Sequence, residues 1–283
     1  MNINWYPGHM AKTKRLISQD LKLVDAVVEV LDARIPYSSK NPDIDELCQQ
    51  KPKIVLLNKA DMADDEATAQ WIAHYQKMGI LALKVNCSSG EGLKRITADL
   101  KELLKEKLER NRQKGVFKPI RIMVVGIPNS GKSSFINRMA NKQRLKTEDR
   151  PGVTVHKQWV KISNEIELMD TPGILWPKLG DETVSLHLAF TGAIKSQILD
   201  VEELGVYLID YLLQNHKDKL VERYQITVED DDDKLTVYDK IALKRGYIFK
   251  KNDPDYERCA NAVLDDFKNA RFGNITLELP EGL

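Results

Sequence analysis

Residues 120–134 read IRIMVVGIPNSGKSS, an apolar run that ends in a glycine-rich turn and leads into a segment typical of a helix. Within it, Gly126–Ser133 fits the pattern G-x-x-x-x-G-K-[ST], and the apolar run before it is typical of a buried strand. The two glycines of the pattern let successive backbone N–H groups point into one concavity, and the helix N-terminus adds its positive end. The stretch therefore predicts a phosphate-binding loop between a strand and a helix.

Two side chains of this loop are expected to act on a bound polyphosphate and its metal ion. Lys132 is placed to neutralise the β and γ phosphates, and the hydroxyl of Ser133 is placed to ligate Mg²⁺. We expect a nucleotide to contact the loop at Asn129, Ser130, Gly131, Lys132, Ser133 and Ser134.

A second motif, LLNKADM at Leu56–Met62, precedes the phosphate loop in the chain and ends another apolar run. An Asn-Lys-x-Asp tetrapeptide at a strand end suits guanine, because the carboxylate of Asp61 accepts from the N1 and N2 hydrogens of the base. Asn58 is expected to bond the other edge of the base and to brace the loop, and Lys59 to lay its aliphatic stem along the ring of the base. Ala60 is the remaining candidate residue of this loop. Adenine would leave the buried carboxylate unpaired, so the motif predicts a guanine nucleotide.

A third segment, NCSSG at residues 86–90, also lies at a predicted strand end. Its backbone N–H groups are positioned to donate to the O6 atom of guanine, and its candidate residues are Asn86, Cys87 and Ser88. The segment lacks the Ser-Ala-Lys letters that are usual at this place.

Two later segments have the features of nucleotide-dependent switch loops. DTPG ends a predicted strand, so the carboxylate of Asp170 is expected to act on Mg²⁺ and the N–H of Gly173 to face the γ phosphate. The preceding RPGVTV segment carries Thr154, whose hydroxyl is expected to complete the metal shell when a γ phosphate is present. We therefore expect Mg²⁺ ligands at Ser133, Thr154 and Asp170, with Thr154 and Lys132 also serving catalysis.

These five elements are those of a GTPase, but the loops for the base precede the phosphate loop, which is the order of a circular permutation. The helical segment 92–114 can join what are otherwise the two chain ends, because chain termini are often close together at the surface. Apolar stretches that alternate with helical segments predict an α/β, doubly wound, mostly parallel six-stranded sheet. The predicted strand regions are 25–34, 53–61, 80–90, 120–132 and a hairpin of 153–163 with 165–173.

Length, composition and charge indicate two domains and a polyanionic partner for the first one. The chain has 283 residues, and we expect a GTPase domain at 1–176 and a mostly helical second domain at 177–283. Residues 1–177 hold 29 Lys and Arg against 21 Asp and Glu, whereas the rest hold 14 against 21. The basic excess of the first part suggests a polyanionic partner.

The cysteine spacing and the absence of long apolar runs favour a soluble protein of a reducing compartment. The three cysteines form no CxxC pair, and no apolar run approaches the length of a membrane span. We therefore expect a cytoplasmic protein without a membrane partner.

The motifs together resemble those of a known family, the circularly permuted bacterial GTPases of the ribosome biogenesis GTPase A type. The resemblance covers nearly the whole chain, in the order WYPGHMAK, LDARIP, NKAD, GIPNSGKSS, DRPGVT and DTPGILWPK. It implies GTP and GDP as ligands, binding to a late precursor of the large (50S) ribosomal subunit through ribosomal RNA, and hydrolysis stimulated by that particle. It also implies that the helical domain contacts RNA.

The residue that positions the attacking water is not evident from the motifs. Ras-like switches use a glutamine directly after D-x-x-G, and Ile174 at this position cannot orient water, which predicts slow intrinsic hydrolysis. His9 in YPGHM is one candidate and His156 a weaker one. Asn129 resembles the asparagine of potassium-activated GTPases, so K⁺ is a further candidate, although Asn129 could simply cap the loop.

Two functions of different classes are compatible with these features. One is a GTP-hydrolysing switch of ribosome assembly, which we expect to be monomeric away from the ribosome. The alternative is a GTP-gated adaptor that signals through protein partners, and the acidic second half of the chain keeps it open.

Overall fold

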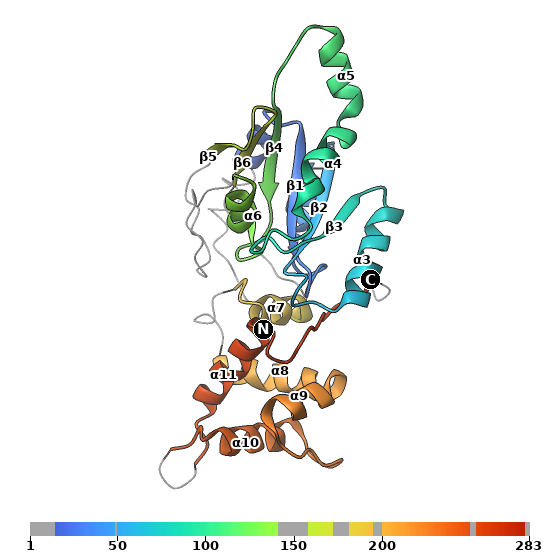
Figure 1. The fold of residues 1–283 in the computed structure, drawn as a ribbon. Helices are drawn as coiled ribbons and strands as arrows, with labels where there is room; N and C mark the ends of the chain where they lie inside the picture. Colours follow the sequence, from blue (N-terminus) through green and yellow to red (C-terminus); the bar gives the residue numbers. More distant parts are fainter. Residues whose placement is uncertain are drawn as a thin grey trace. The chain divides into compact units, whose positions relative to one another are not determined.

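A computed structural model gives the fold of residues 15–48, 50–140, 158–171, 181–194, 200–249 and 253–280. The described residues fall into two compact units, one within Met1–Gly180 and Thr276–Leu283 and the other within Asp181–Ile275. The first unit contains the sheet, and the second contains helices (Figure 1). No helix in the described part of the chain is long and apolar enough to cross a membrane.

The first unit is built on a six-stranded sheet with the order β3-β2-β1-β4-β6-β5. All neighbouring strands are parallel except β5 and β6, which form an antiparallel pair. The strands are β1 (Ala26–Asp32), β2 (Lys53–Asn58), β3 (Leu81–Lys84), β4 (Ile120–Val125), β5 (Gln158–Lys161) and β6 (Ile166–Asp170). The predicted mostly parallel, doubly wound sheet is confirmed.

Helices cover both faces of this sheet, which explains why its central strands are almost continuously apolar. All seven residues of β1 are buried, and five of the six in each of β2 and β4 are buried. A sheet with only one buried face would alternate polar and apolar residues instead.

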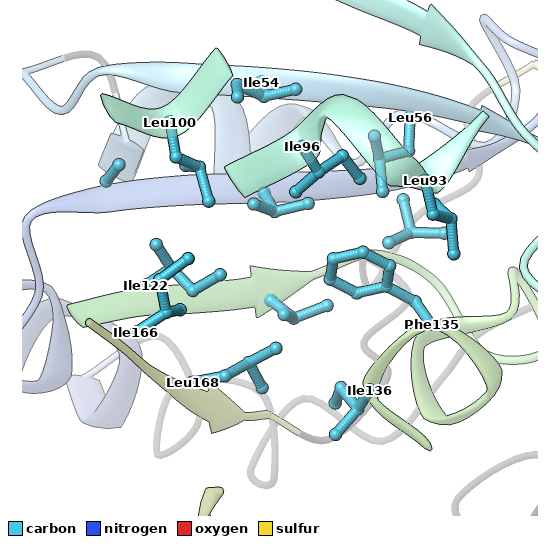
Figure 2. Packing of buried hydrophobic residues seen from close by; sticks show 14 of the residues in the cluster. Ile54, Leu56, Leu93, Ile96, Leu100, Ile122, Phe135, Ile136, Ile166 and Leu168 are labelled. Atoms are coloured by element: carbon cyan, nitrogen blue, oxygen red, sulfur yellow. The ribbon is translucent and has the colours of Figure 1, made fainter. Parts of the chain in front are cut away.

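One face of the sheet packs against α4 (Ile96–Leu103) and α6 (Lys132–Met139) in a single apolar cluster. Figure 2 shows Leu93, Ile96 and Leu100 beside Ile54 and Leu56 of β2, and Phe135 and Ile136 of α6 near Leu168 of β6. Because α6 is packed in this way, its first turn, where the phosphate loop ends, is held against the sheet.

The other face is covered by helical residues 15–21, α2 (Pro42–Cys48) and α3 (Asp65–Lys77). Helical residues 15–21 and α2 pack on β1, β4 and β6, whereas Trp71 and Tyr75 of α3 pack on β1, β2 and β3. The helix α3 begins directly after the Asn-Lys-x-Asp loop and is capped by Asp64, whose side chain accepts from the amide of Ala67. The base loop therefore lies between a buried strand and a capped helix.

The segment predicted as one long helix at 92–114 is a short 3₁₀ turn (Leu93–Arg95) followed by α4 and α5 (Lys105–Gln113), with a break at Leu104. Ile96 and Leu100 of α4 are buried, but α5 buries no residue, and Figure 1 shows it continuing away from the sheet. The contacts of α5 with the rest of the unit include Leu108, which is partly buried against the same apolar cluster, and an ion pair between Lys107 and Asp25.

The second unit consists of five helices in its described part, and α8 packs mainly against α11. Gly205 of α8 makes this contact close, since a Cβ there would lie 2.7 Å from the Cβ of Ala260 in α11. Aspartates cap four of the helices at their N-termini. The helices are α7 (Glu182–Phe190), α8 (Val201–Asn215), α9 (Lys217–Tyr224), α10 (Lys234–Arg245) and α11 (Tyr256–Lys268).

A buried ion-pair cluster around Asp266 of α11 ties this unit together. Its carboxylate accepts from the guanidinium groups of Arg223 and Arg271 and from the hydroxyl of Tyr224. Burial alone would raise the pKa of Asp266, but these bonds and charges outweigh burial and lower it. The carboxylate is therefore ionised at neutral pH.

The last described residues do not stay with the helical unit but return to the first one. Leu277 N donates to Arg34 O at 2.8 Å, and the carboxylate of Glu278 accepts from the amides of Tyr37 and Ser38. Trp71 of α3 also donates to the carbonyl of Glu278. The first unit therefore includes these last residues as well as the sheet. Such long-range contacts leave no local pattern in the sequence.

Candidate nucleotide site

The phosphate loop lies between β4 and α6, as its sequence predicts, and its two glycines are required by the backbone. Gly126 has φ 149°, and a Cβ there would lie 2.4 Å from the carbonyl oxygen of Val30 in β1. Gly131 has φ 102°, and a Cβ there would lie 2.1 Å from Nδ2 of Asn58. Both positions combine a backbone conformation that favours glycine with a close approach that excludes a side chain.

A buried ammonium group closes this loop. Lys132 is the first residue of α6 and is 6% exposed, and its Nζ donates to the carbonyl oxygen of Ile127 at 2.8 Å. The hydroxyl oxygen of Ser130 is buried and has no hydrogen-bond partner within the described residues. An ammonium, a helix N-terminus and an unsatisfied hydroxyl in one loop fit the phosphates of a nucleotide.

Asn129, Ser133 and Ser134 occupy the remaining positions of the loop. Asn129 is half-buried with φ 58°, a left-handed conformation that asparagine tolerates better than most residues. Ser133 and Ser134 are half-buried in the first turn of α6. The hydroxyl of Ser133 is thus on the same helix turn as Lys132, which suits a ligand to Mg²⁺ bound at the phosphates.

Asn58, the last residue of β2, joins three loops through its side-chain amide. Its Nδ2 donates to the carbonyl of Ser130 in the phosphate loop at 2.7 Å, and its Oδ1 accepts from the amide of Cys87 at 2.8 Å. Asn58 is 3% exposed, so both bonds are shielded from water. The residue expected to brace the base loop thus ties that loop to both the phosphate loop and the segment 86–90.

The other members of the tetrapeptide follow on the turn after β2. Lys59 has φ 60°, and its Nζ lies 2.9 Å from Oδ2 of Asp32. Ala60 is buried, and its amide donates to the carbonyl of Val85. Asp61 is exposed at the turn, which leaves its carboxylate accessible to a base.

The segment 86–90 forms a tight turn whose amides already have acceptors inside the protein. Oδ1 of Asn86 accepts from the amides of Ser88 and Ser89 at 2.9 and 3.0 Å, and the carbonyl of Ser88 accepts from Arg138 of α6. Burial raises the pKa of the Cys87 thiol to about 12, so this side chain is neutral. A backbone amide of this turn that donated to guanine O6 would therefore be shared between the base and the side chain of Asn86.

The predicted switch residues are only partly within the described residues. Asp170 is the last residue of β6 and pairs in register with Val124 of β4, the strand that leads into the phosphate loop. The next residue, Thr171, is buried and donates its hydroxyl to the carbonyl of Val124 at 2.6 Å. These contacts bring the start of the DTPG segment to the end of the sheet at which β4 leads into the phosphate loop.

Four further candidates, His9, Thr154, His156 and Gly173, lie outside the described residues. Among the residues that the structure describes, no cluster of three His, Cys, Asp or Glu could hold a metal by itself.

Sequence reasoning missed the residues that lie beneath the base loop. Asp32 at the end of β1 is 2% exposed and accepts from Arg34 through both its carboxylate oxygens, at 3.0 and 2.8 Å. Burial alone would raise the pKa of Asp32, but the charges of Arg34 and Lys59 outweigh burial and hold it well below its usual value. Asp32 and Arg34 lie in the LDARIP segment (31–36), which in the sequence is only a mark of the family. That segment alone does not indicate an ion pair with Lys59.

Comparisons with known proteins identify relatives of this chain. The family model described as a 50S ribosome-binding GTPase matches residues 121–240, and the model described as RsgA GTPase matches residues 46–179. The ribosome biogenesis GTPase A of Priestia megaterium is 49% identical over 282 residues, which cover 99% of this chain and 98% of that protein. That of Thermotoga maritima is 29% identical over 281 residues, covering 99% of this chain and 96% of that protein.

Two solved structures have the same fold. GDP-bound YlqF matches with a TM-score of 0.66 and 26% identity, covering 94% of this chain and 100% of that one. GNP-bound YlqF from Thermotoga maritima gives the same TM-score and identity over 95% of this chain and 99% of that one.

A phosphate loop after β4, with an Asn-Lys-x-Asp loop that precedes it in the chain and bonds to it through Asn58, defines a circularly permuted P-loop GTPase. The fold class and the GTP-hydrolysing class expected from the sequence are confirmed. The chain belongs to the ribosome biogenesis GTPase A family.

Proposed function

We propose that this GTPase acts as a switch in late assembly of the large ribosomal subunit, binding the precursor particle and its RNA. The observation that carries the proposal is the joined set of loops at Asn58, in which a guanine-type loop and a phosphate loop form one site. The 50S ribosome-binding GTPase description and the full-length similarity to ribosome biogenesis GTPase A proteins support the choice of particle. Such a role places the protein in the cytoplasm, and we propose that it is monomeric away from the particle.

In this proposal the first half of the chain reads the base. The carboxylate of Asp61 accepts from the N1 and N2 hydrogens of guanine, and the stem of Lys59 lies along the ring. Asn86, Cys87 and Ser88 form the turn that faces the O6 atom. Asn58 and Ala60 hold this loop in place, as their bonds within the protein indicate.

The phosphate loop and the switch segments act on the triphosphate. Lys132 neutralises charge on the β and γ phosphates, and backbone amides from Asn129 to Ser134 surround them. Ser133, Thr154 and Asp170 would hold Mg²⁺, which supplies charge neutralisation between those phosphates. The N–H of Gly173 would face the γ phosphate, so this segment would respond to hydrolysis.

We propose that hydrolysis is slow until the ribosomal particle completes the site. Ile174 cannot orient a water molecule, so His9, which follows Pro7 and Gly8 in the sequence, is the proposed positioning group for the water. K⁺ at Asn129 is a second way to supply charge, and the left-handed turn at Asn129 suits either this role or a purely local one.

Two exposed basic segments are proposed as RNA contacts because they combine cations with exposed aromatic rings. In the first unit, Arg110, Arg112 and Lys114 at the end of α5 precede Phe117, which is 85% exposed. In the second unit, the end of α10 and the following residues carry Lys244, Arg245 and the 60% exposed Phe249. Cations that meet phosphates and rings that stack on bases are the usual means of binding single-stranded RNA.

A second candidate function is the GTP-gated adaptor. It is favoured by the 14 Lys and Arg against 21 Asp and Glu after residue 177 and by the exposed acidic turn at Asp230. In that case the helical unit would dock on a basic protein surface, and hydrolysis would only reset the switch.

The experiment that separates the two is steady-state GTP hydrolysis in KCl and in NaCl at matched ionic strength, with and without large ribosomal subunits. The assembly role predicts strong stimulation by subunits, which His9→Ala abolishes and which the control His74→Ala, on α3, retains. If His156→Ala abolishes the stimulation instead, the water-positioning role moves to that residue. A rate that subunits leave unchanged in both salts would contradict the assembly role and favour the adaptor.

The RNA surfaces are tested by the salt dependence of binding. Replacing Arg110, Arg112 and Lys114 with alanine is expected to reduce the slope of log affinity against log salt concentration by about 0.7 for each phosphate of a single strand that the variant no longer neutralises. Replacing Lys244 and Arg245 tests the second segment in the same way. An unchanged slope in both variants would show that RNA binds elsewhere.

A further inference from the structure

A buried three-member ion-pair network lies directly under the base loop. Oδ2 of Asp32 lies 2.8 Å from Nη2 of Arg34 and 2.9 Å from Nζ of Lys59. Oδ1 of Asp32 also accepts from Nε and from the backbone amide of Arg34. The side chains of Asp32 and Arg34 are 3% and 2% exposed, whereas that of Lys59 is 24% exposed.

The pairing of β1 with β2 explains why Lys59 lies close to the carboxylate of Asp32. Asp32 ends β1 and is the register partner of Asn58, which ends β2, so the turn that carries Lys59 begins beside the carboxylate. The amide of Ala33 donates to the carbonyl of Asn58 at 2.7 Å and so holds the two chain segments together. The ammonium of Lys59 is thus held by the buried carboxylate, while the lysine side chain as a whole stays partly exposed.

The carboxylate is itself held rigidly. The amide of Asp32 donates to the hydroxyl of Ser39, and the guanidinium of Arg34 donates to both oxygens of the carboxylate. The carbonyl of Arg34 accepts in turn from the amide of Leu277. A long lysine side chain loses considerable rotamer freedom when it is fixed, so an anchor that fixes it before the ligand arrives favours binding.

We propose that Asp32 is a positioning residue for guanine recognition, which acts by holding the ammonium of Lys59 so that the lysine stem is preset against the base. The inference rests on the proposed role of the Asn-Lys-x-Asp loop in reading guanine. Asp32 itself does not touch the nucleotide, and Arg34 serves to keep the carboxylate ionised and oriented.

The test is a double-mutant cycle on GDP affinity, measured with a fluorescent GDP analogue well below the melting temperature of each variant. Asp32→Asn removes the anchor, and Lys59→Met keeps an unbranched apolar stem but removes the group that is anchored. Each variant is expected to bind GDP about 10-fold more weakly, and the double variant to lie within about 2-fold of Lys59→Met. Asp266→Asn, which removes a paired buried carboxylate from the helical unit, is the matched control and is expected to lower the melting temperature without changing GDP affinity.

A merely structural role for Asp32 gives a different result. It would make the two affinity losses additive, or would leave the affinity unchanged while the melting temperature falls, and either result overturns the proposal. Lys59→Arg, at a partly exposed position, provides a second test that does not depend on the folding of Asp32→Asn. Because arginine can still reach the carboxylate, it should bind GDP within about 3-fold of the parent protein, and a loss equal to that of Lys59→Met would contradict the proposal.

Failure of the proposed base site can be recognised separately through Asp61→Ala. If that variant binds GDP as well as the parent does, the loop does not read guanine, and both the proposed function of the loop and this inference fail. If Asp61→Ala loses affinity while Asp32→Asn does not, only the positioning role of Asp32 is overturned.

Discussion

The substitution Asn58→Asp tests the contact that joins the base loop to the phosphate loop. The new side chain has the same shape and keeps the acceptor for the amide of Cys87, but its second oxygen faces the carbonyl of Ser130 at the place where Nδ2 now donates over 2.7 Å. One hydrogen bond is lost, and a buried carbonyl is left unpaired beside a like partial charge. These changes cost about 2 to 4 kcal/mol together, since a net hydrogen bond contributes about 1 kcal/mol and a buried unsatisfied group costs about 1 to 3 kcal/mol.

This cost divides between stability and nucleotide affinity. If the phosphate loop moves away from the new carboxylate in the free protein, nucleotide binding must restore the loop, and the affinity for GDP falls by about 30-fold to 1,000-fold. If the loop cannot move, the same free energy appears as reduced stability. Fluorescence titration with GDP and urea unfolding measure the two parts, and their sum is the predicted quantity.

The effect of Asn58→Asp is compared with that of a matched control variant. Asn41→Asp changes another buried asparagine of the same unit, whose Oδ1 caps the amide of Asp43, and is expected to leave GDP affinity unchanged. Because a protonated carboxyl group can donate to the carbonyl of Ser130, the defect of Asn58→Asp should shrink as the pH falls toward about 5. If affinity and stability both stay within about 0.5 kcal/mol of the parent, the joining role of Asn58 is wrong.

Three further predictions concern other parts of the chain. Gly131→Ala forces a Cβ to 2.1 Å from Asn58 at φ 102°, so GDP binding measured by titration should fall by at least about 100-fold, and a loss below about 3-fold would contradict the account. Asp266→Asn should lower the free energy of unfolding in urea by about 2 to 3 kcal/mol at pH 7. Because the pKa of Asp266 is lowered on folding, its contribution is present above the unfolded value of about 3.9 and is lost as the pH falls further, so the difference from the parent should narrow toward pH 3. Glu278→Ala removes the acceptor for the amides of Tyr37 and Ser38 and should lower the stability of the first unit by about 1 to 2 kcal/mol in the same assay; a melting curve equal to the parent's would show that these bonds contribute nothing.

The fold could be predicted well because its strongest signals are local. The phosphate loop needs glycines where the backbone is left-handed or crowded, and Gly126 and Gly131 have both properties. The central strands are buried on both faces and so read as continuous apolar runs. The parallel order and the final antiparallel hairpin followed from these signals and from the short link at Asn164.

The helical unit was less legible in sequence. The helices α9 and α10 are weakly marked in the sequence, since α9 buries only Leu220 and Tyr224 and the stretch before α10 is dominated by acidic residues. The acidic stretch nevertheless begins α10, because Asp233 caps its N-terminus. Both helices are stabilised by tertiary packing, which cannot be read from a single sequence.

The loops that carry the motifs could be predicted from the sequence, but the contacts that support these loops could not. Asn58, Lys59 and Lys132 lie in the loops that the motifs predict, whereas the ion pair of Lys59 with Asp32 depends on the register of β1 against β2. The return of Glu278 to the first unit depends on contacts across the whole length of the chain. Contacts of this kind have no sequence periodicity, so the pattern of apolar residues could not indicate them.

The measurement that tests the central claim most directly is the base preference of Asp61→Asn. If the loop after β2 reads the guanine of the nucleotide whose phosphates bind after β4, replacing the acceptor carboxylate with an amide should reduce GDP affinity by at least about 100-fold. It should also raise affinity for the xanthine nucleotide XDP, whose C2 carbonyl accepts from the new amide. Unchanged GDP affinity with no gain for XDP would contradict the claim that the two loops form one guanine nucleotide site.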